Sequence, residues 1–333
     1  MKTLCFVFRK KNPLFFSIEK VFEPLINNTI VSGWKAIAIT VPHYSTGIPA
    51  LFRNIFYLRK VKSDIFHITG DIHYAVFAFP RNKTILTIHD CVFIRQHKGF
   101  KRWLMNCLFL KWPVHYSAYV TTISEQSKFD IVKYSGCDPD KITVIPDPVS
   151  AHIRFSPKEF NSTQPVILFI GSTPNKNLDR VLEALKGISC ILEIVGKVDD
   201  EKKRKMEQAG IRYRISANLT EEQLNAKYTE ADLVLFPSLF EGFGLPIIEA
   251  QQAGRVVITS NKSPMSEVAG TAACLVNPLD AISIREAVVR VIGDEEYRAN
   301  LIKAGFENIR KYGSSAISEE YGLLYKKLIS VSP

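Results

Sequence analysis

The chain has 333 residues, of which 46% are apolar and 23% charged, with 17 Gly and 17 Pro. These values are typical of globular α/β proteins, and the length predicts two domains of about 150 residues each. No apolar segment reaches the roughly 18 residues needed to cross a bilayer, which excludes a chain built on membrane-spanning helices and predicts a soluble protein.

The formal net charge of +10 is concentrated in the first half of the chain. Residues 1–150 carry 20 Lys and Arg against 10 Asp and Glu, whereas residues 151–333 carry 23 of each. This asymmetry predicts an anionic partner for the first half, either a phospholipid surface, a diphosphate-linked lipid acceptor or nucleic acid. Nucleic acid is the least favoured, because the sequence has no zinc-finger or RNP signature. The simpler alternative is that these charges only keep the protein soluble.

The cysteines and the first residues bear on the cellular compartment. The six cysteines show no CxxC spacing and predict buried, reduced thiols; they are residues 5, 91, 107, 137, 190 and 274. The apolar start is interrupted by Arg9-Lys10-Lys11, so no signal peptide is expected. We therefore expect a cytoplasmic protein.

In the first half, short apolar segments alternate with helical patterns. Strands are predicted at 3–8, 35–40, 65–69, 84–89, 118–122 and 142–145, with helices at 18–26 and 49–59. Such alternation predicts a parallel sheet covered by helices on both faces. Pro146-Asp147-Pro148 interrupts the pattern and a polar segment, 156–165, follows. We place the domain boundary between residues 155 and 156.

The second half repeats this alternation more clearly. Strands are predicted at 165–171, 191–196, 232–237 and 255–259, and helices at 178–187, 199–208, 246–254, 282–291, 296–311 and 318–329. Thr220-Glu221-Glu222-Gln223 has the spacing of a capping box and predicts the start of a further helix.

The segment after the predicted strand 232–237 carries two carboxylates around a glycine-rich loop. Glu241 lies in the loop, and Glu249 lies one turn into the helix that begins near Pro246. Gly242 and Gly244 allow the backbone to approach a ligand, and the N–H groups at a helix start favour an anion. Such a site suits a diphosphate between two polyols, which is the chemistry of a nucleotide sugar.

A second loop, 171–177, follows the first strand of the second half, at the position where open α/β sheets bind ligands. Lys176 is placed to set an ammonium group against a diphosphate, and Asn177 is a candidate N-cap for the next helix. A solvated loop lysine is the alternative for Lys176.

These residues resemble the paired-glutamate motif of the family 4 glycosyltransferases, which are retaining enzymes of the GT-B fold. The resemblance extends over Pro165 to Pro278, including Ser266-Glu267-Val268-Ala269-Gly270, and more weakly over Asp64 to Val149. It implies two Rossmann-like α/β domains, 1–155 and 156–315, whose parallel sheets face each other across a cleft. A last helix, 316–330, is then expected to pack back on the first domain.

The resemblance also implies roles for individual residues. Glu241 is expected to bind hydroxyls of the transferred sugar, and Glu249 the ribose of the nucleotide. The implied donor-binding residues are Gly171, Lys176, Asn177, Gly242, Phe243, Gly244, Leu245 and Glu249. Ser172 and Asn175 stand where many family members carry an arginine, and Arg180 is a candidate replacement.

In the first half, Thr87-Ile88-His89-Asp90 resembles the His-Asp motif of the family. This implies that His89 faces the transferred sugar and is catalytic together with Glu241 and Lys176, although a structural histidine is the alternative. Asp90 is expected to orient the loop or His89. His73 and Ser124 follow other predicted strands and are candidates for the acceptor side, and Ser124 equally for a helix cap.

The resemblance therefore implies retaining transfer of a hexose from a GDP- or UDP-sugar to a glycan, expected to be a lipid-linked saccharide of cell-surface polysaccharide synthesis. We expect no cofactor and no metal ion, because Asp138-Pro139-Asp140 has the composition of a turn. Three basic, aromatic segments, 9–16, 51–62 and 100–112, predict peripheral contact with the inner face of the membrane. The alternatives are a nucleotide-sugar epimerase or hydrolase, and a non-catalytic binding protein at the membrane surface.

Overall fold

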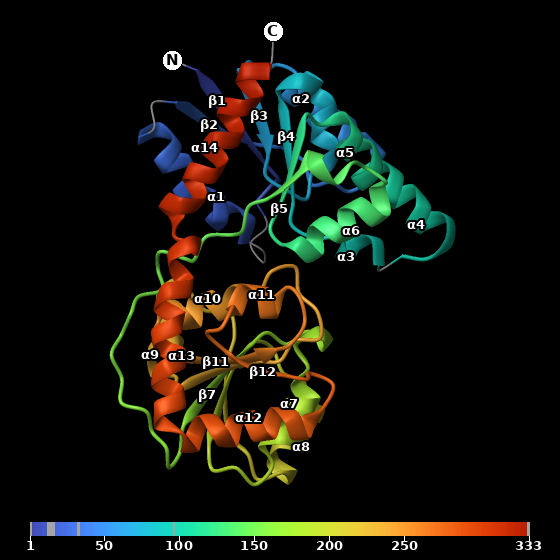
Figure 1. Ribbon diagram of the computed structural model, residues 1–333. Helices are drawn as coiled ribbons and strands as arrows, with labels where there is room; N and C mark the ends of the chain where they lie inside the picture. Colours follow the sequence, from blue (N-terminus) through green and yellow to red (C-terminus); the bar gives the residue numbers. More distant parts are fainter. Residues whose placement is uncertain (1, 12–16, 32–33, 96, 332–333) are drawn as a thin grey trace. The chain divides into compact units, whose positions relative to one another are not determined.

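The computed structural model describes residues 2–11, 17–31, 34–95 and 97–331. The chain forms two compact units, which are labelled by element in Figure 1. The first unit comprises Met1–Pro148 and Ser314–Pro333, and the second comprises Val149–Gly313. The chain leaves the first unit seven residues before the boundary expected from the sequence, because the segment from Val149 onward already belongs to the second unit. There the Val149 N–H donates to the Tyr312 carbonyl at 2.9 Å.

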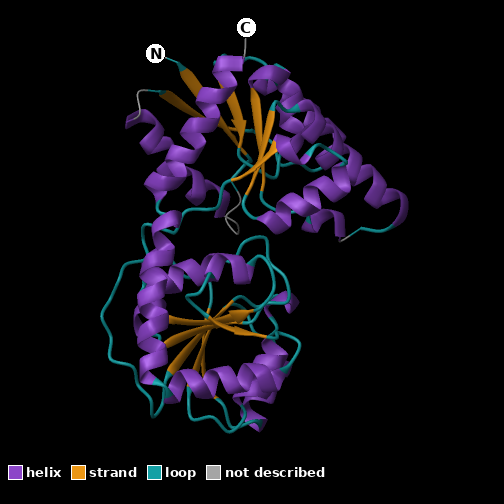
Figure 2. Cartoon of the chain, viewed as in Figure 1, coloured by secondary structure: helices purple, strands orange, loops and turns teal. Residues whose placement is uncertain are grey.

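The first unit contains a parallel sheet of six strands in the order β2-β1-β3-β4-β5-β6. The strands of both units are coloured orange in Figure 2. The strands are β1 (Thr3–Phe8), β2 (Lys35–Thr40), β3 (Ile65–Ile68), β4 (Thr84–Ile88), β5 (Tyr119–Thr122) and β6 (Ile142–Val144). All six predicted strands are thereby confirmed. The chain adds β2 on one side of β1 and then β3 on the other side, so the direction in which strands are added reverses at β1.

Alternate side chains of β1 enter two separate cores of the first unit. Leu4 and Phe6 pack with α1 (Ser17–Val31) and α14 (Ser314–Val331), whereas Cys5 and Val7 face the opposite core. That core is closed by α2 (Ile48–Leu58), α3 (Val92–Arg95), α5 (Trp112–Tyr116) and α6 (Glu125–Ser135). The α4 helix (Gly99–Asn106) continues through a π-helical turn, Cys107–Lys111, into α5. The last helix packs against α1.

The second unit has its own six-stranded parallel sheet, in the order β12-β11-β10-β7-β8-β9. Its strands are β7 (Val166–Ile170), β8 (Ile191–Val195), β9 (Arg212–Ser216), β10 (Leu233–Phe236), β11 (Val256–Ser260) and β12 (Cys274–Val276). The two edge strands, β9 and β12, are additional to the four predicted. An edge strand pairs on one side only, so β9 retains polar residues at alternate positions and lacks a continuous apolar signal.

The helices of the second unit follow the predicted alternation. They are α7 (Leu178–Leu185), α8 (Asp200–Gln208), α9 (Glu221–Glu230), α10 (Leu245–Gln252), α11 (Met265–Ala269), α12 (Ala281–Gly293) and α13 (Glu295–Asn308). The capping box at the start of α9 is confirmed, because Thr220 and Gln223 exchange side-chain to backbone hydrogen bonds.

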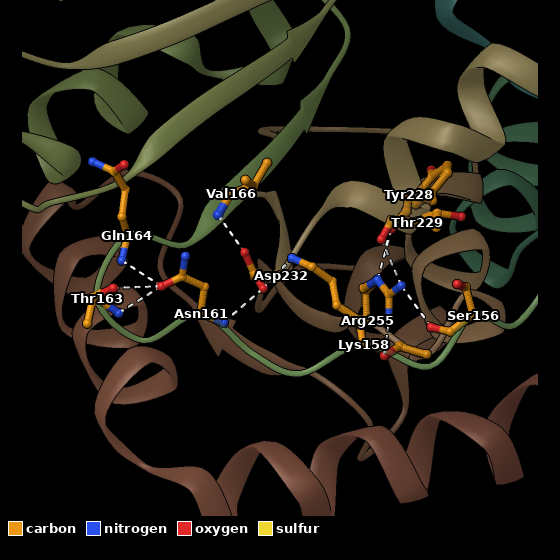
Figure 3. A network of polar contacts seen from close by, with 11 residues as sticks. Ser156, Lys158, Asn161, Thr163, Gln164, Val166, Tyr228, Thr229, Asp232 and Arg255 are labelled. Atoms are coloured by element: carbon orange, nitrogen blue, oxygen red, sulfur yellow. Dashed lines mark hydrogen bonds and ion pairs between the residues drawn. The ribbon is translucent and has the colours of Figure 1, made fainter.

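The segment that leads into β7 is fixed to the sheet by a buried carboxylate. Asp232, just before β10, accepts hydrogen bonds from the Lys158 ammonium at 2.5 Å, the Asn161 N–H at 3.1 Å and the Val166 N–H at 2.7 Å (Figure 3). Because the carboxylate is 4% exposed, its charge depends on these donors for stabilisation in place of water.

A buried histidine ties the last helix to the sheet of the first unit. His67 on β3 is fully buried, with Nδ1 2.8 Å from the Tyr325 hydroxyl of α14 and Nε2 2.7 Å from Thr87 Oγ1 of β4. Burial lowers the pKa of His67 from 6.5 to about 3, because the charged imidazolium would lose its hydration.

We predict that Asp232→Asn destabilises the second unit. The asparagine amide lacks the negative charge that three donors now stabilise, and its NH2 group replaces one acceptor by a donor. We therefore expect the free energy of unfolding, measured by urea denaturation, to fall by about 2–4 kcal/mol. Asp200→Asn is the matched control, because this exposed carboxylate only pairs with Lys203 on the same helix. Equal unfolding midpoints for the two variants would contradict the structural role of Asp232.

The titration of His67 predicts a pH-dependent stability of the first unit. Between pH 6.5 and pH 3 the unfolded chain binds a proton at this histidine that the folded protein does not bind. Stability therefore falls as the pH decreases, by up to about 1.4 kcal/mol per pH unit. Urea denaturation of the wild type and of His67→Gln at pH 7 and pH 5 measures this slope. We expect the wild type to lose about 2 kcal/mol more than the variant, and parallel losses would refute the assignment.

Candidate functional site

The two loops singled out in the sequence lie side by side at the carboxyl edge of the second sheet. One follows β7 and the other follows β10, and these strands are hydrogen-bonded neighbours. The loops are joined directly, because the Leu239 N–H donates to the Asn175 carbonyl at 2.8 Å. This edge is where open α/β sheets bind their ligands.

Lys176 and Glu241 form an ion pair across these loops. Lys176 Nζ lies 2.7 Å from Glu241 Oε1, and the two side chains are only 17% and 14% exposed. The same ammonium lies 4.6 Å from the centre of the Phe236 ring, and Asn175 Nδ2 donates to Glu241 Oε1 at 3.3 Å. Both charges are therefore held at defined positions within one site.

Gly171 makes room for the lysine. Its φ is +101°, and a Cβ at this position would lie 2.7 Å from Lys176 Cε. The aliphatic part of the lysine thus runs directly over the backbone at the end of β7, which a side chain at residue 171 would prevent. This contact explains why a glycine precedes the loop.

The glycine-rich loop leads directly into α10. Gly244 has φ +111° and occupies the N-cap position, and Leu245 and Pro246 begin the helix. Phe243 is buried and packs edge-on against the Tyr312 ring, with 5.7 Å between ring centres. The aromatic side chain thus anchors the glycine-rich loop in the core.

Glu249 is oriented by a tyrosine that the sequence did not mark as functional. The hydroxyl of Tyr228 on α9 donates to Glu249 Oε2 at 2.6 Å. Burial and the adjacent carboxylate raise the pKa of Tyr228 well above its usual range, so the phenol remains a donor. One sequence signal could have marked Tyr228 as functional, namely a tyrosine at a core-facing position of a helix. The hydroxyl of a buried tyrosine requires a hydrogen-bond partner.

The prediction that Asn177 caps α7 is wrong. Asn177 has φ +71° and its side chain makes no capping hydrogen bond. Its amide instead donates to the carbonyls of Pro237 at 3.1 Å and Pro278 at 2.7 Å, while its Oδ1 accepts from Arg180 at 2.9 Å. The left-handed backbone turns the side chain away from the helix and toward the loops after β10 and β12. Asn177 thereby braces the site, and Arg180 lies beside it.

His89 lies at the carboxyl edge of the first sheet, directly after β4. Its Nε2 is 3.0 Å from the Thr69 carbonyl, and its Nδ1 is 3.8 Å from Asp147 Oδ1. A Cβ at Gly70 would lie 2.8 Å from His89 Cδ2, so a glycine is needed beside the ring. The pKa of Asp147 is raised because its burial outweighs the opposing effect of the adjacent His89. The imidazole therefore has a defined orientation at this edge.

The three residues predicted for the acceptor side all have local structural roles. His73 is buried, and its Nδ1 contacts the Phe109 carbonyl at 2.5 Å; burial lowers the pKa of this histidine. Asp90 accepts from the Val92 N–H at 2.9 Å, and Ser124 caps α6 by accepting from the Ser127 N–H at 3.2 Å. For Ser124 the capping alternative is confirmed. Contact of any of the three with an acceptor stays a prediction.

The candidate metal motif forms a turn. Asp138 Oδ1 accepts from the Asp140 N–H at 2.9 Å, which confirms the turn expected from Asp138-Pro139-Asp140. Within the described ranges no three His, Cys, Asp or Glu residues gather in an arrangement suited to a metal ion.

Models of known protein families match both units of the chain. The family model for glycosyl transferases group 1 matches residues 152–308, and the model for glycosyltransferase family 4 matches residues 15–152. The chain is 24% identical over 249 residues to the serotype-specific mannosyltransferase WbdA of Escherichia coli, covering 66% of this chain and 30% of WbdA. It is 26% identical over 251 residues to the O-antigen chain mannosyltransferase RfbU of Salmonella typhimurium, covering 72% of this chain and 70% of RfbU. The chain thus spans less than a third of the length of WbdA.

Solved structures share the fold over essentially the whole chain. Sucrose-phosphate synthase from Thermosynechococcus elongatus superposes with a TM-score of 0.78 at 18% identity, covering 100% of both chains. Anabaena Alr3699/HepE, solved with UDP and glucose, gives a TM-score of 0.76 at 15% identity and covers 98% of this chain and 100% of the other. With the two family models covering residues 15–308 between them, the chain belongs to glycosyltransferase family 4 and has the GT-B fold.

Proposed function

We propose that the protein is a retaining glycosyltransferase that moves a hexose from a GDP- or UDP-sugar to a glycan acceptor. The observation that carries this proposal is the contact between Lys176 and Glu241 at the carboxyl edge of the second sheet, beside the start of α10. A cation for a diphosphate and a carboxylate for sugar hydroxyls are thereby placed at adjacent positions. Glu249, one turn into α10, supplies a second carboxylate for the ribose.

The proposed chemistry uses charges that the chain itself supplies. As the bond between the sugar C1 and the phosphate oxygen breaks, positive charge develops on the sugar ring and negative charge on the departing diphosphate. Lys176 and the N–H groups at the start of α10 stabilise the diphosphate, and one well-placed donor contributes about 3 kcal/mol. These groups supply the positive charge that a divalent cation would otherwise place against the diphosphate. We therefore propose an activity that needs no divalent cation.

Retention of configuration follows from attack on the face that the diphosphate leaves. The acceptor hydroxyl oxygen forms the new bond to C1, and its proton passes to the departing phosphate oxygen. This scheme needs no covalent nucleophile. His89, at the carboxyl edge of the first sheet, is proposed to contact the sugar, and the loops held by His73, Asp90 and Ser124 to line the acceptor side.

Binding of the donor exchanges partners within the site. In the structure Lys176 is paired with Glu241. A diphosphate replaces this carboxylate as the partner of the lysine, and the released Glu241 accepts hydrogen bonds from sugar hydroxyls. A complete nucleotide sugar satisfies both groups, whereas a nucleotide alone leaves the carboxylate without its cation.

The relatives support a polysaccharide acceptor. WbdA and RfbU are mannosyltransferases, and RfbU acts on an O-antigen chain. HepE has been solved with UDP and glucose. We therefore propose a hexosyl donor and an acceptor in cell-surface polysaccharide synthesis, with a lipid-linked saccharide as the form presented to the enzyme. The missing loop arginine is the one feature that favours a non-catalytic binding protein, and the intact Lys176–Glu241 pair argues against it.

The acceptor is proposed to reach the enzyme at an anionic membrane surface. No helix within residues 2–11, 17–31, 34–95 and 97–331 has the length and apolar character to cross a bilayer. Between residues 91 and 124, however, the sequence contains no Asp or Glu, and it carries basic residues next to exposed aromatic ones. We define the α4 surface as Phe100, Lys101, Arg102, Trp103, Lys111 and Trp112.

The α4 surface has the character of an interfacial helix. Phe100, Trp103 and Trp112 are 74%, 58% and 51% exposed, and the rings of Phe100 and Trp103 stack with 5.5 Å between centres. Exposed aromatic rings beside Lys and Arg suit the boundary between acyl chains and anionic headgroups. Of the other basic segments, α2 also exposes Phe52 and Phe56, and residues 12–16 of the segment 9–16 lie outside the described part of the chain. We propose a cytoplasmic enzyme bound peripherally to the inner face of the membrane.

Opposite changes in nucleotide binding test the donor site. We expect Glu241→Gln to tighten binding of GDP or UDP by about three- to tenfold, because it releases Lys176. The same variant should lose sugar transfer, and Lys176→Met should weaken nucleotide binding. Calorimetric titration gives the affinities, and incubation with GDP-mannose or UDP-glucose gives the products and their anomers.

Lys203→Met is the matched control for these variants, because Lys203 pairs with Asp200 on the surface of the same unit. Unchanged nucleotide affinity in Glu241→Gln would contradict the exchange of partners. An inverted product would overturn the retaining mechanism, and sugar release or epimerisation without an acceptor would favour the hydrolase or epimerase alternative.

Vesicle binding tests the α4 surface. We expect the protein to sediment with phosphatidylcholine vesicles that contain 30% phosphatidylglycerol, taken as about the anionic fraction of a bacterial membrane, but not with phosphatidylcholine alone. Replacing Phe100 and Trp103 by Ser should weaken binding about tenfold. The control replaces Leu279 and Ile282 by Ser, which are 55% and 66% exposed on the electrically neutral second unit. Equal losses in both variants would show that the α4 surface is not the membrane contact.

A further inference from the structure

Tyr228 stands out among the buried side chains because it contacts the proposed nucleotide site without lining it. Its ring is fully buried among the largest core side chains, and its hydroxyl meets Glu249 Oε2 at 2.6 Å. A hydrogen bond of this length to a carboxylate is short and charge-assisted. The phenol has one hydrogen to donate, and Glu249 receives it.

The position of this hydroxyl is fixed by the surrounding backbone. Arg255 donates from Nε to the Tyr228 carbonyl at 2.9 Å and from NH2 to the Thr229 carbonyl at 3.0 Å (Figure 3). The same guanidinium contacts the carbonyl of its own preceding residue, Gly254, at 3.3 Å, and the Arg255 backbone N–H donates to the Ala250 carbonyl of α10 at 2.8 Å. Arg255 therefore joins the carboxyl ends of α9, which carries Tyr228, and of α10, which carries Glu249.

A second contact holds α9 from the preceding residue. Lys227 Nζ lies 3.1 Å from Glu193 Oε1 on β8, and that glutamate is buried. The helix that presents Tyr228 is thus attached both to the sheet and to α10. A donor on such a rigid frame sets the direction of the carboxylate that it contacts, as the supporting groups of preorganised sites do.

The orientation of the Glu249 carboxylate determines how well it can bind the ribose of the nucleotide. A carboxylate binds the adjacent hydroxyls of a ribose well only when its oxygens face them, and a freely rotating side chain loses conformational entropy on binding. The hydrogen bond from Tyr228 holds Oε2 of Glu249 in place and thereby restricts the rotation of the carboxylate.

We propose that Tyr228 is a positioning residue that makes the nucleotide site selective for ribose over 2′-deoxyribose, acting through Glu249. This inference rests on the proposed function, in which Glu249 binds the ribose. It adds a specificity determinant, with Arg255 as the group that holds it in place.

The experiment compares matched nucleotide pairs. Calorimetric titration of GDP against 2′-deoxy-GDP, and of UDP against 2′-deoxy-UDP, gives a selectivity ratio for the wild type and for Tyr228→Phe. Phenylalanine fills the same volume and removes only the hydroxyl. We expect Tyr228→Phe to weaken binding of the ribonucleotide about fivefold, within the effect of one lost hydrogen bond, and to weaken binding of the deoxyribonucleotide less, because the latter offers Glu249 only the 3′-hydroxyl.

Two further variants separate the possible outcomes. Tyr213→Phe is the matched control, because Tyr213 also donates to a carboxylate, Glu207, at 3.2 Å on the surface of the same unit. It should keep the wild-type ratio. Glu249→Gln should reduce the ratio at least as much as Tyr228→Phe does.

Each outcome supports or overturns a defined statement. Equal weakening of both nucleotides in Tyr228→Phe means that the tyrosine only maintains the fold, and overturns the proposal. If Glu249→Gln changes the ratio and Tyr228→Phe does not, the ribose assignment survives and the positioning role fails. If neither variant changes the ratio, the assignment of Glu249 to the ribose fails together with the positioning role. If no nucleotide binds the wild type, the proposed function fails as well.

Discussion

The ion pair between Lys176 and Glu241 is the interaction on which the rest of the site depends. Two residues 65 positions apart meet because β7 and β10 are neighbours in a parallel sheet, so their following loops emerge together. Gly171 admits the lysine, and Asn175 contacts both the loop backbone and the carboxylate. The Asn177 amide is hydrogen-bonded to the carbonyls of Pro237 and Pro278 in the adjoining loops. The charges of the site are therefore placed by topology first and by local loop geometry second.

The contact between Lys176 and Glu241 holds two opposite charges together at 2.7 Å. Neither Lys176 nor Glu241 is left desolvated without a partner, which avoids the cost of an isolated charge in a half-buried position. The same neutralisation reduces attraction for any anion that cannot also satisfy the carboxylate. A ligand with a diphosphate and a polyol at the right spacing compensates both groups. Selectivity for the complete donor is thus an expected property of the pair and not of either residue alone.

Much of this arrangement is readable from the sequence, and the exceptions have physical reasons. The central strands are continuous apolar segments, and Pro246 and the capping box at Thr220 mark helix starts, so these elements are predictable. The edge strand β12 is three residues long and β9 is half polar, which removes the apolar signal. Asn177 has a cap's position and composition, but its left-handed backbone directs the amide elsewhere. The contact of Tyr228 with Glu249 joins two helices, and no local pattern encodes it.

The second unit begins and ends at one place, because Val149 and Tyr312 are hydrogen-bonded to each other. It is in effect a complete domain inserted into the first unit, whose last helix follows it in the chain. During synthesis the inserted domain has all its strands before α14 leaves the ribosome, since domains generally fold as units as they emerge. The first unit must wait for that helix to cover Leu4, Phe6 and His67. The nascent protein thus completes its glutamate-bearing domain first, and part of one face of its N-terminal sheet lacks its cover until α14 has been synthesised.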